Sequence, residues 1–245
     1  MKFIFITLFP EQVEAAASHS ILKRGVETGA IQIECINPRD FSLDRHHSVD
    51  DAPFGGGVGM VLKPEPMVEA IRLAKAKAPG APVIAMSPGG VTFRQALAET
   101  WAKEEVGLIF VCGHYEGFDE RIYHWVDSKI SIGDFVLTGG ELPALMIMDA
   151  VSRFVPGVLG KLASAEEDSF SSGLLEYPQY TRPVVFEGME VPDVLRNGNH
   201  QLIARWRRKQ ALKATYLLRP DLLPIEPDKL DAKLLQEIRE ELEED

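Results

Sequence analysis

Three glycine-rich segments each follow a short apolar run and could form the walls of a small-molecule site. VIAM is followed by SPGG, LIFVC by GHYEGFDER, and KIS by IGDFVLTGGE. Open α/β sheets bind ligands beyond the carboxyl ends of their strands, where glycine lets the backbone approach a ligand closely. A single glycine of this kind usually serves a turn. Three such loops in succession favour a ligand site.

A second candidate site is the cationic segment RWRRKQ, residues 205–210. From Arg196 to Arg219 the chain has seven Lys and Arg residues and no Asp or Glu, although its formal net charge is −11. One reading is a solvated helix face whose long side chains cover apolar surface. The absence of a compensating acid favours a surface for a polyanion, most simply nucleic-acid phosphate.

Helical spacing assigns directions to the side chains of this segment. At about 100° per residue, apolar residues share one sector of the helix: Leu202, Ile203, Trp206, Ala214 and Leu217. Arg205, Arg208 and Lys209 lie together on another side. We therefore expect Trp206 to pack inward and the three cations to point outward, where they would contact phosphates and position a nucleic acid.

The motifs of several other enzyme classes are missing. FGGGVGM, residues 54–60, is not a dinucleotide fingerprint because Met60 stands where G-x-G-x-x-G needs its last glycine. Neither a G-x-x-x-x-G-K-[ST] loop nor a G-x-S-x-G elbow occurs. His46 and His47 are adjacent, but no other Cys or His follows at zinc-like spacing. No metal site is predicted.

The elements that must position these loops alternate between strands and helices. The runs KFIFIT, IQIECI, PVIAM, GLIFVC and KISIGDFVL alternate with helical patterns over about 11–28, 64–78, 92–104 and 140–154. This order predicts an α/β layer with a largely parallel sheet up to about residue 160.

The chain changes character after residue 160. KLASAEEDSFSSGLLEYPQYTRP is small, polar and acidic, as is typical of a linker or mobile loop. Helical patterns follow over about 199–218 and 228–244, with Asp228 as N-cap of the second. A small, mainly helical C-terminal domain is predicted.

Composition and targeting signals indicate a globular protein of a reducing cytoplasm. Of 245 residues, 45% are apolar and 26% charged, close to the globular average. The first apolar run is about eight residues long and lacks a cleavage site, and no uncharged apolar stretch approaches the roughly 20 residues of a membrane span. Cys35 and Cys112 lie in strand-like runs, which favours buried thiols over a disulfide.

Taken together, the loops and the cationic segment resemble one family, the bacterial tRNA (guanine-N1)-methyltransferases, or TrmD family, of the SPOUT class. The resemblance is carried, in family order and over nearly the whole chain, by DRHHSVDDAPFGGGVGM, MSPGG, VCGHYEGFDERI, SIGDFVLTGGELPALMIMDAVSRFVPGVLG, EDSFSSGLLEYPQYTRP and VPDVLRNGNHQLIARWRRKQALKATYLLRPDLL.

The resemblance implies a fold class and a domain plan. A SPOUT-type parallel sheet would contain a C-terminal deep trefoil knot, a topology that is otherwise nearly absent from proteins. Residues 1–160 would form the knotted α/β domain that binds S-adenosyl-L-methionine, 161–175 a flexible interdomain linker, and 176–245 a helical tRNA-binding domain. The family also implies a homodimer with active sites at the subunit interface, to which ELPALMIMDAVSRF would contribute.

The resemblance also assigns cofactor-binding positions. They are Gly113, Ile132, Gly133, Asp134, Phe135, Val136 and Leu137, with Pro88, Tyr115, Glu116, Gly140 and Pro143 lining the same pocket. Two residues depart from the family pattern, in which Tyr is more usual where Phe135 stands and Arg where His114 stands.

Catalytic roles follow from the chemistry of guanine N1 at tRNA position 37, immediately 3′ of the anticodon. A base must remove the N1 proton, and a cation or donor must stabilise the charge that spreads to O6. The resemblance implies Asp168 as the base and Arg153 as the stabilising cation. Composition alone indicates a solvated acidic loop at Glu166–Asp168. Any Mg²⁺ used in catalysis would be held partly by the substrate.

Two alternatives from other classes remain. One is a SPOUT enzyme that methylates another RNA position, such as a ribose 2′-hydroxyl, which needs no base at N1. The other is a non-catalytic RNA-binding protein with the same fold. The matches at Arg153 and Asp168 argue against both.

Overall fold

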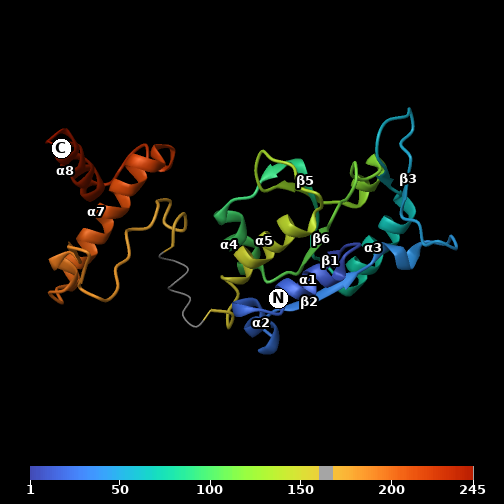
Figure 1. The fold of residues 1–245 in the computed structure, drawn as a ribbon, viewed down its shortest axis with the longest axis horizontal. Helices are drawn as coiled ribbons and strands as arrows, with labels where there is room; N and C mark the ends of the chain where they lie inside the picture. Colours follow the sequence, from blue (N-terminus) through green and yellow to red (C-terminus); the bar gives the residue numbers. More distant parts are fainter. Residues whose placement is uncertain (160–167, 245) are drawn as a thin grey trace. The chain divides into compact units, whose positions relative to one another are not determined.

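A computed structural model describes residues 1–159 and 168–244 (Figure 1). The chain divides into two compact units, Met1–Leu162 and Ala163–Asp245. Among the described helices, none has the length and apolar character needed to cross a bilayer. Cys35 and Cys112 are both free thiols.

The first unit is built on a five-stranded parallel sheet. In spatial order its strands are β2 (Gln32–Ile36), β1 (Lys2–Ile6), β6 (Leu108–Val111), β5 (Val83–Thr92) and β7 (Ser128–Ser131). The central runs FIFI and LIFV are buried on both faces, as parallel strands covered by helices must be. The predicted parallel α/β layer is confirmed.

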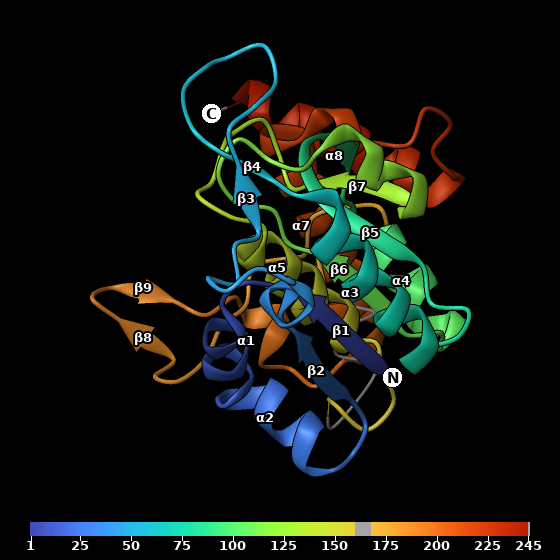
Figure 2. The ribbon, with the colours of Figure 1, turned by 90° about the vertical axis from the view of Figure 1, so that its right-hand side faces the viewer.

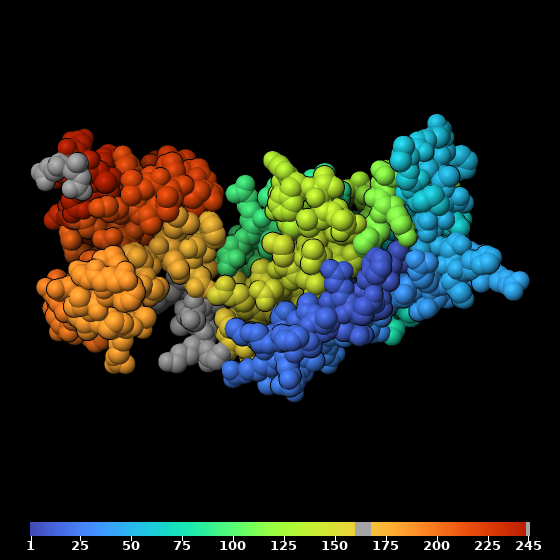
Figure 3. Space-filling view, viewed as in Figure 1, coloured from blue at the N-terminus to red at the C-terminus, as the bar shows by residue number. Residues whose placement is uncertain are grey.

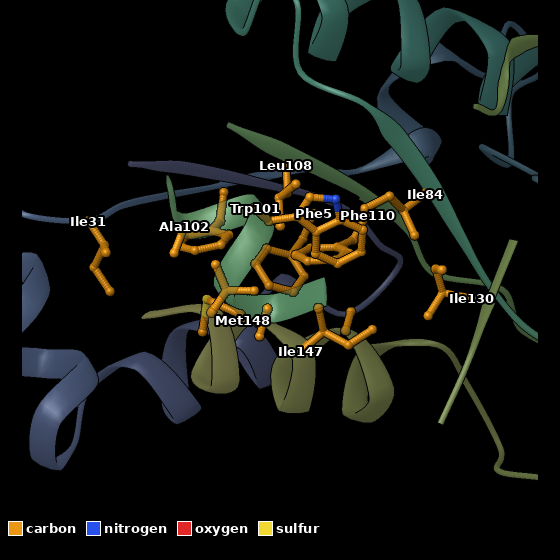
Figure 4. Packing of buried hydrophobic residues seen from close by; sticks show 14 of the residues in the cluster. Phe5, Ile31, Ile84, Trp101, Ala102, Leu108, Phe110, Ile130, Ile147 and Met148 are labelled. Carbon is orange, nitrogen blue, oxygen red and sulfur yellow. The ribbon is translucent and has the colours of Figure 1, made fainter. Parts of the chain in front are cut away.

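Two hydrophobic cores form because successive strand residues point to opposite faces. Phe3 and Phe5 of β1 pack with the helices α1 (Pro10–Ala17), α4 (Gln95–Glu104) and α5 (Glu141–Ser152), with α2 (Ser20–Glu27) at the margin (Figure 4). Ile4 and Ile6 pack on the other face with α3 (Pro64–Lys77) and the 3₁₀ helix η2 (Glu120–Trp125).

Several predicted elements have different bounds. The helix predicted over 11–28 is two helices, because the chain leaves helical geometry at His19, whose φ is −129°, and Ser20 is left-handed at +53°. The strand predicted over KISIGDFVL ends at Ser131, and the rest is a loop. Strand β5 continues past SPGG to Thr92, with a register break between Met86 and Val91.

Several short elements escaped prediction because two to four residues are too few to show a periodicity. They are the hairpin of β3 (Asp50–Asp51) and β4 (Val61–Leu62), the hairpin of β8 (Val185–Phe186) and β9 (Met189–Glu190), and the 3₁₀ helices η1 (Pro38–Phe41), η3 (Asp193–Leu195) and η4 (Pro220–Leu222). The segment between β3 and β4 projects from the first unit (Figures 2 and 3).

The second unit is organised by two helices, α7 (His200–Leu218) and α8 (Lys229–Glu244). Asn199 caps α7 by accepting from the amides of Gln201 and Leu202. The predicted cap at Asp228 is confirmed, since its Oδ1 accepts from the amide of Asp231 at 2.8 Å. A small core joins the helices: Leu174, Ala211, Leu212, Leu234, Leu235 and Ile238.

Candidate active site

A cavity of about 420 Å³ lies in the first unit, beyond the carboxyl ends of β6 and β7 and beside the register break of β5. Its walls come from the three predicted glycine-rich loops: Met86–Pro88, Gly113–Phe118 and Ser131–Gly140, except Asp134. These strands are parallel, so their carboxyl ends meet at one edge of the sheet. The loops, up to about 50 residues apart in sequence, therefore converge on one site, as the sequence predicted.

Nearly all the predicted cofactor residues line this cavity. They are Pro88, Gly113, Tyr115, Glu116, Ile132, Gly133, Phe135, Val136, Leu137, Gly140 and Pro143. Asp134 is exposed and does not contribute to the wall. Contact of these residues with a cofactor stays a prediction.

Close backbone packing explains the glycine at position 140. A Cβ on Gly140 would lie 2.7 Å from Cys112 Cα and 2.8 Å from Gly113 N, so any side chain would separate the two loops. The amide of Gly140 donates to Gly113 O at 2.9 Å. The second and third loops are thus joined backbone to backbone at the cavity wall.

Sequence reasoning missed several polar side chains of the site. Ser87, Glu120, Tyr123 and Thr138 also line the cavity. Burial, together with the nearby Glu120 carboxylate, raises the pKa of the Tyr123 phenol above its ordinary value. Tyr123 therefore remains a neutral hydrogen-bonding group at physiological pH. Its position in a 3₁₀ helix gave no periodic signal.

A buried carboxylate behind the cavity was missed as well. Glu141, the first residue of α5, is 1% exposed. Its Oε1 accepts from Thr7 Oγ1 at 2.6 Å, and its Oε2 lies 2.7 Å from Nε2 of His114, which lines the cavity. Nothing in the sequence indicated this role, because an acidic residue in the first turn of a helix is common and the two partners of Glu141 lie 134 and 27 residues away.

The segment between β3 and β4 supports the second loop of the cavity. The Glu116 amide donates to Met60 O at 3.0 Å, and the Leu62 amide donates to Gly117 O at 2.9 Å. A Cβ on Gly59 would lie 2.4 Å from Glu116 Oε1. The glycine run that fails as a dinucleotide fingerprint therefore serves close packing against the cavity wall.

The comparison with known proteins now decides the family. A family model described as tRNA (Guanine-1)-methyltransferase TrmD matches residues 1–225. The chain belongs to the TrmD family. The resemblance seen in the sequence is thereby confirmed.

Several curated TrmD-family relatives are similar to the chain over most of their length. Each is named tRNA (guanine-N(1)-)-methyltransferase. The relative from Desulfitobacterium hafniense is 54% identical over 97% of this chain and 90% of its own. That from Bacillus subtilis is 55% identical over 93% and 94%, and that from Geotalea uraniireducens is 55% identical over 100% and 96%.

The two residues expected to catalyse the TrmD reaction belong to different units. Arg153 follows α5 in the first unit, and its amide donates to Asp149 O at 3.2 Å. Asp168 opens the described part of the second unit, is half-buried, and accepts at its carbonyl from the Ser171 amide. Residues 161–167 of the predicted linker, including Glu166 and Glu167, lie outside the described residues. The roles of Arg153 and Asp168 stay predictions.

The cationic helix faces its neighbour, so the predicted outward orientation was wrong. Arg205 Nη2 lies 2.6 Å from Glu237 Oε1. Lys209 Nζ lies 3.1 Å from Glu237 Oε2 and 2.5 Å from Glu241 Oε1. The hydrogen bonds from Lys209 and, to a smaller extent, from Arg205 hold the pKa of the Glu237 carboxyl below its usual value.

Arg208 makes the most enclosed of these pairs. Its Nε and Nη2 donate to the two oxygens of Asp231 at 2.9 and 2.5 Å, and Asp231 is 3% exposed. The Asp231 carboxylate raises the pKa of the guanidinium. The window 196–219 contains no acid, but α8 supplies the acids across the helix pair.

The error arose from the wrong choice of buried face. The buried residues of α7 are Ala211, Leu212 and Thr215, whereas Leu202 and Leu217 of the predicted apolar sector are exposed. Trp206 is half-buried beside Tyr180, with ring centroids 6.2 Å apart. A role of Arg205, Arg208 and Lys209 in tRNA binding stays a prediction.

Proposed function

We propose that this chain transfers the methyl group of S-adenosyl-L-methionine to N1 of the guanosine at tRNA position 37. The observation that carries the proposal is the family match over residues 1–225, with relatives of the same printed activity at 54–55% identity over nearly the whole chain. The convergence of the three glycine-rich loops on one cavity supports it independently.

The proposal includes the SPOUT architecture. The third loop and the second would belong to a deep trefoil knot, and their backbone contact at Gly140 is the kind of close crossing that a knot requires. Residues 1–160 would form the knotted domain, 161–175 the linker and 176–245 the tRNA-binding domain.

A homodimer with active sites between subunits completes the proposal. Phe135 and Val136 in the cavity wall are 52% and 82% exposed, and Leu142 and Met146 of α5 are also exposed. Apolar side chains at a cavity mouth favour coverage by a ligand or a second subunit. A cytoplasmic location remains part of the prediction.

The cavity fits the proposed cofactor in size and in the character of its walls. Sites for small molecules commonly measure about 300–1,000 Å³, and this one has about 420 Å³. Backbone around Gly113 and Ile132–Leu137 would supply amide and carbonyl groups, and Gly140 keeps the wall thin enough for them to reach a ligand. When bound, the cofactor supplies an electrophilic methyl group on a sulfonium.

The protein's part in the chemistry is to remove and stabilise charge on the base. The Asp168 carboxylate takes the N1 proton while N1 forms its bond to the methyl carbon and the carbon–sulfur bond breaks. The Arg153 guanidinium donates to O6, where negative charge accumulates. An aspartate is a weak base for this proton, so stabilisation at O6 and exclusion of water must assist it.

Two further features of the proposed reaction are how the guanine reaches Asp168 and whether a metal ion assists. A guanine inside a stacked loop must leave the stack to reach Asp168. In the described parts of the chain, no three His, Cys, Asp or Glu side chains gather as metal ligands. We propose that a Mg²⁺ ion that assists would be held partly by the substrate.

The test is methyl transfer to a tRNA transcript with guanosine at position 37, followed by nuclease mapping of the product. Asp168→Asn should leave cofactor affinity nearly intact and remove most single-turnover methylation. Asp40→Asn, at an exposed position of η1, is the matched control. Full activity of Asp168→Asn would contradict the role of Asp168. Methylation at a ribose hydroxyl would establish the alternative RNA position, and absence of cofactor binding would establish a non-catalytic RNA-binding protein.

The tRNA contacts proposed for Arg205, Arg208 and Lys209 carry their own test. Each cation is paired with α8, so tRNA binding would exchange a carboxylate for a phosphate. Neutralising the three should weaken binding and flatten its salt dependence by a slope of roughly 0.9 for each phosphate that is no longer neutralised. An unchanged slope would show that the ion pairs serve the helix pair alone.

A further inference from the structure

The buried Glu141 carboxylate forms a hydrogen-bonded chain that ends at the cavity wall. Thr7 Oγ1 donates to Oε1, and His114 Nε2 contacts Oε2 at 2.7 Å. The Glu141 side chain is 2% exposed, while that of His114 is 16% exposed and belongs to the lining of the cavity. The chain thus runs from the amino-terminal strand to the site proposed for the methyl donor.

The donors in this chain can be assigned from the partners. Thr7 Oγ1 accepts from the Phe9 amide at 2.9 Å, which leaves its own proton for Glu141. An ionised carboxylate only accepts, so Nε2 of His114 carries a proton. In the neutral imidazole this leaves Nδ1 as an acceptor. No protein group within residues 1–159 and 168–244 hydrogen-bonds to Nδ1.

The surrounding backbone holds the imidazole in place. A Cβ on Gly139 would lie 2.3 Å from His114 Cε1 and 2.7 Å from Glu141 Oε2, so glycine at this position leaves room for the pair. Phe9 packs on the ring at a centroid distance of 4.7 Å. His114 and Gly139 are also bridged through their backbones, which joins two loops of the cavity. The ring is therefore held between Phe9, Gly139 and Glu141.

We propose that Glu141 is a positioning residue of the methyl-donor site, which fixes His114 as an Nε2–H tautomer so that Nδ1 accepts a hydrogen bond from the bound ligand. The inference rests on the proposed function. The ligand group must be an N–H or O–H donor, and S-adenosyl-L-methionine offers an ammonium, two ribose hydroxyls and the adenine amino group.

Glu141→Gln tests the tautomer directly. The Gln carbonyl must face Thr7, because Thr7 Oγ1 already accepts from Phe9 and needs an acceptor for its proton. The Gln NH₂ group then faces His114 and donates to Nε2, which moves the imidazole proton to Nδ1. The substitution preserves the size of the side chain and turns Nδ1 of His114 from an acceptor into a donor.

Two measurements follow for the full-length chain. Ring ¹⁵N shifts of His114 should report a protonated Nε2 in the wild type and a protonated Nδ1 in Glu141→Gln. Calorimetry with S-adenosyl-L-methionine should show binding weakened about tenfold, as expected for one hydrogen bond. Glu65→Gln, an exposed glutamate in the first turn of α3, controls for loss of a helix-terminal charge and should leave both unchanged.

A double-mutant cycle separates positioning from folding. His114→Gln keeps a donor toward Glu141 but lacks Nδ1, so it should also lose about tenfold in affinity, and Glu141→Gln should have little further effect in that background. Repeating the titration with 5′-methylthioadenosine locates the donor: a persisting effect assigns it to the nucleoside, either a ribose hydroxyl or the adenine amino group, and a vanished effect assigns the ammonium.

The outcomes that overturn the inference differ from those that overturn the proposed function. A wild-type protein that binds no S-adenosyl-L-methionine contradicts the function. A wild type that binds it, with unchanged affinity in His114→Gln or equal losses from Glu141→Gln in both backgrounds, contradicts the role of Glu141. A wild-type His114 that carries a proton on Nδ1, with or without one on Nε2, overturns it without any variant.

Discussion

Removing the Arg208 guanidinium should destabilise the second unit because it leaves a buried carboxylate without its main partner. Asp231 is 3% exposed and accepts both Nε and Nη2 of Arg208. Breaking a buried ion pair typically costs about 3–5 kcal/mol. The Arg208 side chain is 36% exposed, so water can replace part of the contact and the cost falls at or just below the lower end of that range. We expect Arg208→Met to lower the free energy of unfolding by about 2–3 kcal/mol.

That change is large for this unit, whose core contains only six buried residues among those described. Whole domains are stable by about 5–15 kcal/mol. Amide hydrogen exchange resolves the unit, since the opening free energies of α7 and α8 amides should fall together while those of β1 and β6 do not change. Lys213→Met is the control, because its partner Glu241 lies 3.7 Å away and is 46% exposed. That pair should contribute under about 1 kcal/mol.

The double variant Arg208→Met/Asp231→Leu should recover most of the stability, because an apolar pair of similar volume is often as stable as a buried ion pair. Equal protection of the α7 and α8 amides from hydrogen exchange in Arg208→Met and Lys213→Met would refute the reasoning. If the large destabilisation is observed, weaker tRNA binding by an Arg208 variant cannot be assigned to a missing phosphate interaction unless stability is measured beside it.

Three further predictions concern packing and titration. Gly140→Ala should lower stability by about 1–3 kcal/mol in thermal unfolding and weaken cofactor binding, since its Cβ would meet Cys112 2.7 Å away; full retention of both would contradict the close packing. Hydrogen bonds from Ser48, chiefly its amide, lower the pKa of Asp44 from 3.8 to about 2. The stabilisation of this loop is therefore fully present above pH 3.8 and is lost as the pH falls through 2. The chemical shift of the Ser48 amide should change with pH in that window, and in Asp44→Asn it should not. Burial raises the pKa of the Cys35 thiol from 9.0 to about 11. Iodoacetamide should therefore alkylate it at pH 8 far more slowly than a free cysteine. A rate equal to that of free cysteine would show that the thiol is accessible to solvent and has an ordinary pKa.

Much of the first unit could be predicted because its signals are local. The central strands of the parallel sheet begin as short buried runs, and each glycine-rich segment follows such a run in the sequence. Parallel pairing then requires the loops to share an edge, so the cavity followed from element order alone. The split of the first helix and the hairpins with two-residue strands could not be predicted, because they involve too few residues to change the hydrophobic periodicity.

The sequence by itself determined the family, the parallel α/β layer and the glycine loops that meet in the cavity, because these depend on local composition and order. Tertiary structure decided which charges meet. Glu141 contacts Thr7 across 134 residues, and the cations of α7 meet acids 23 to 32 residues further along. Helical spacing gives the relative angle of side chains on one helix but not which face another helix covers, and that choice turned an apparently outward cationic face toward α8.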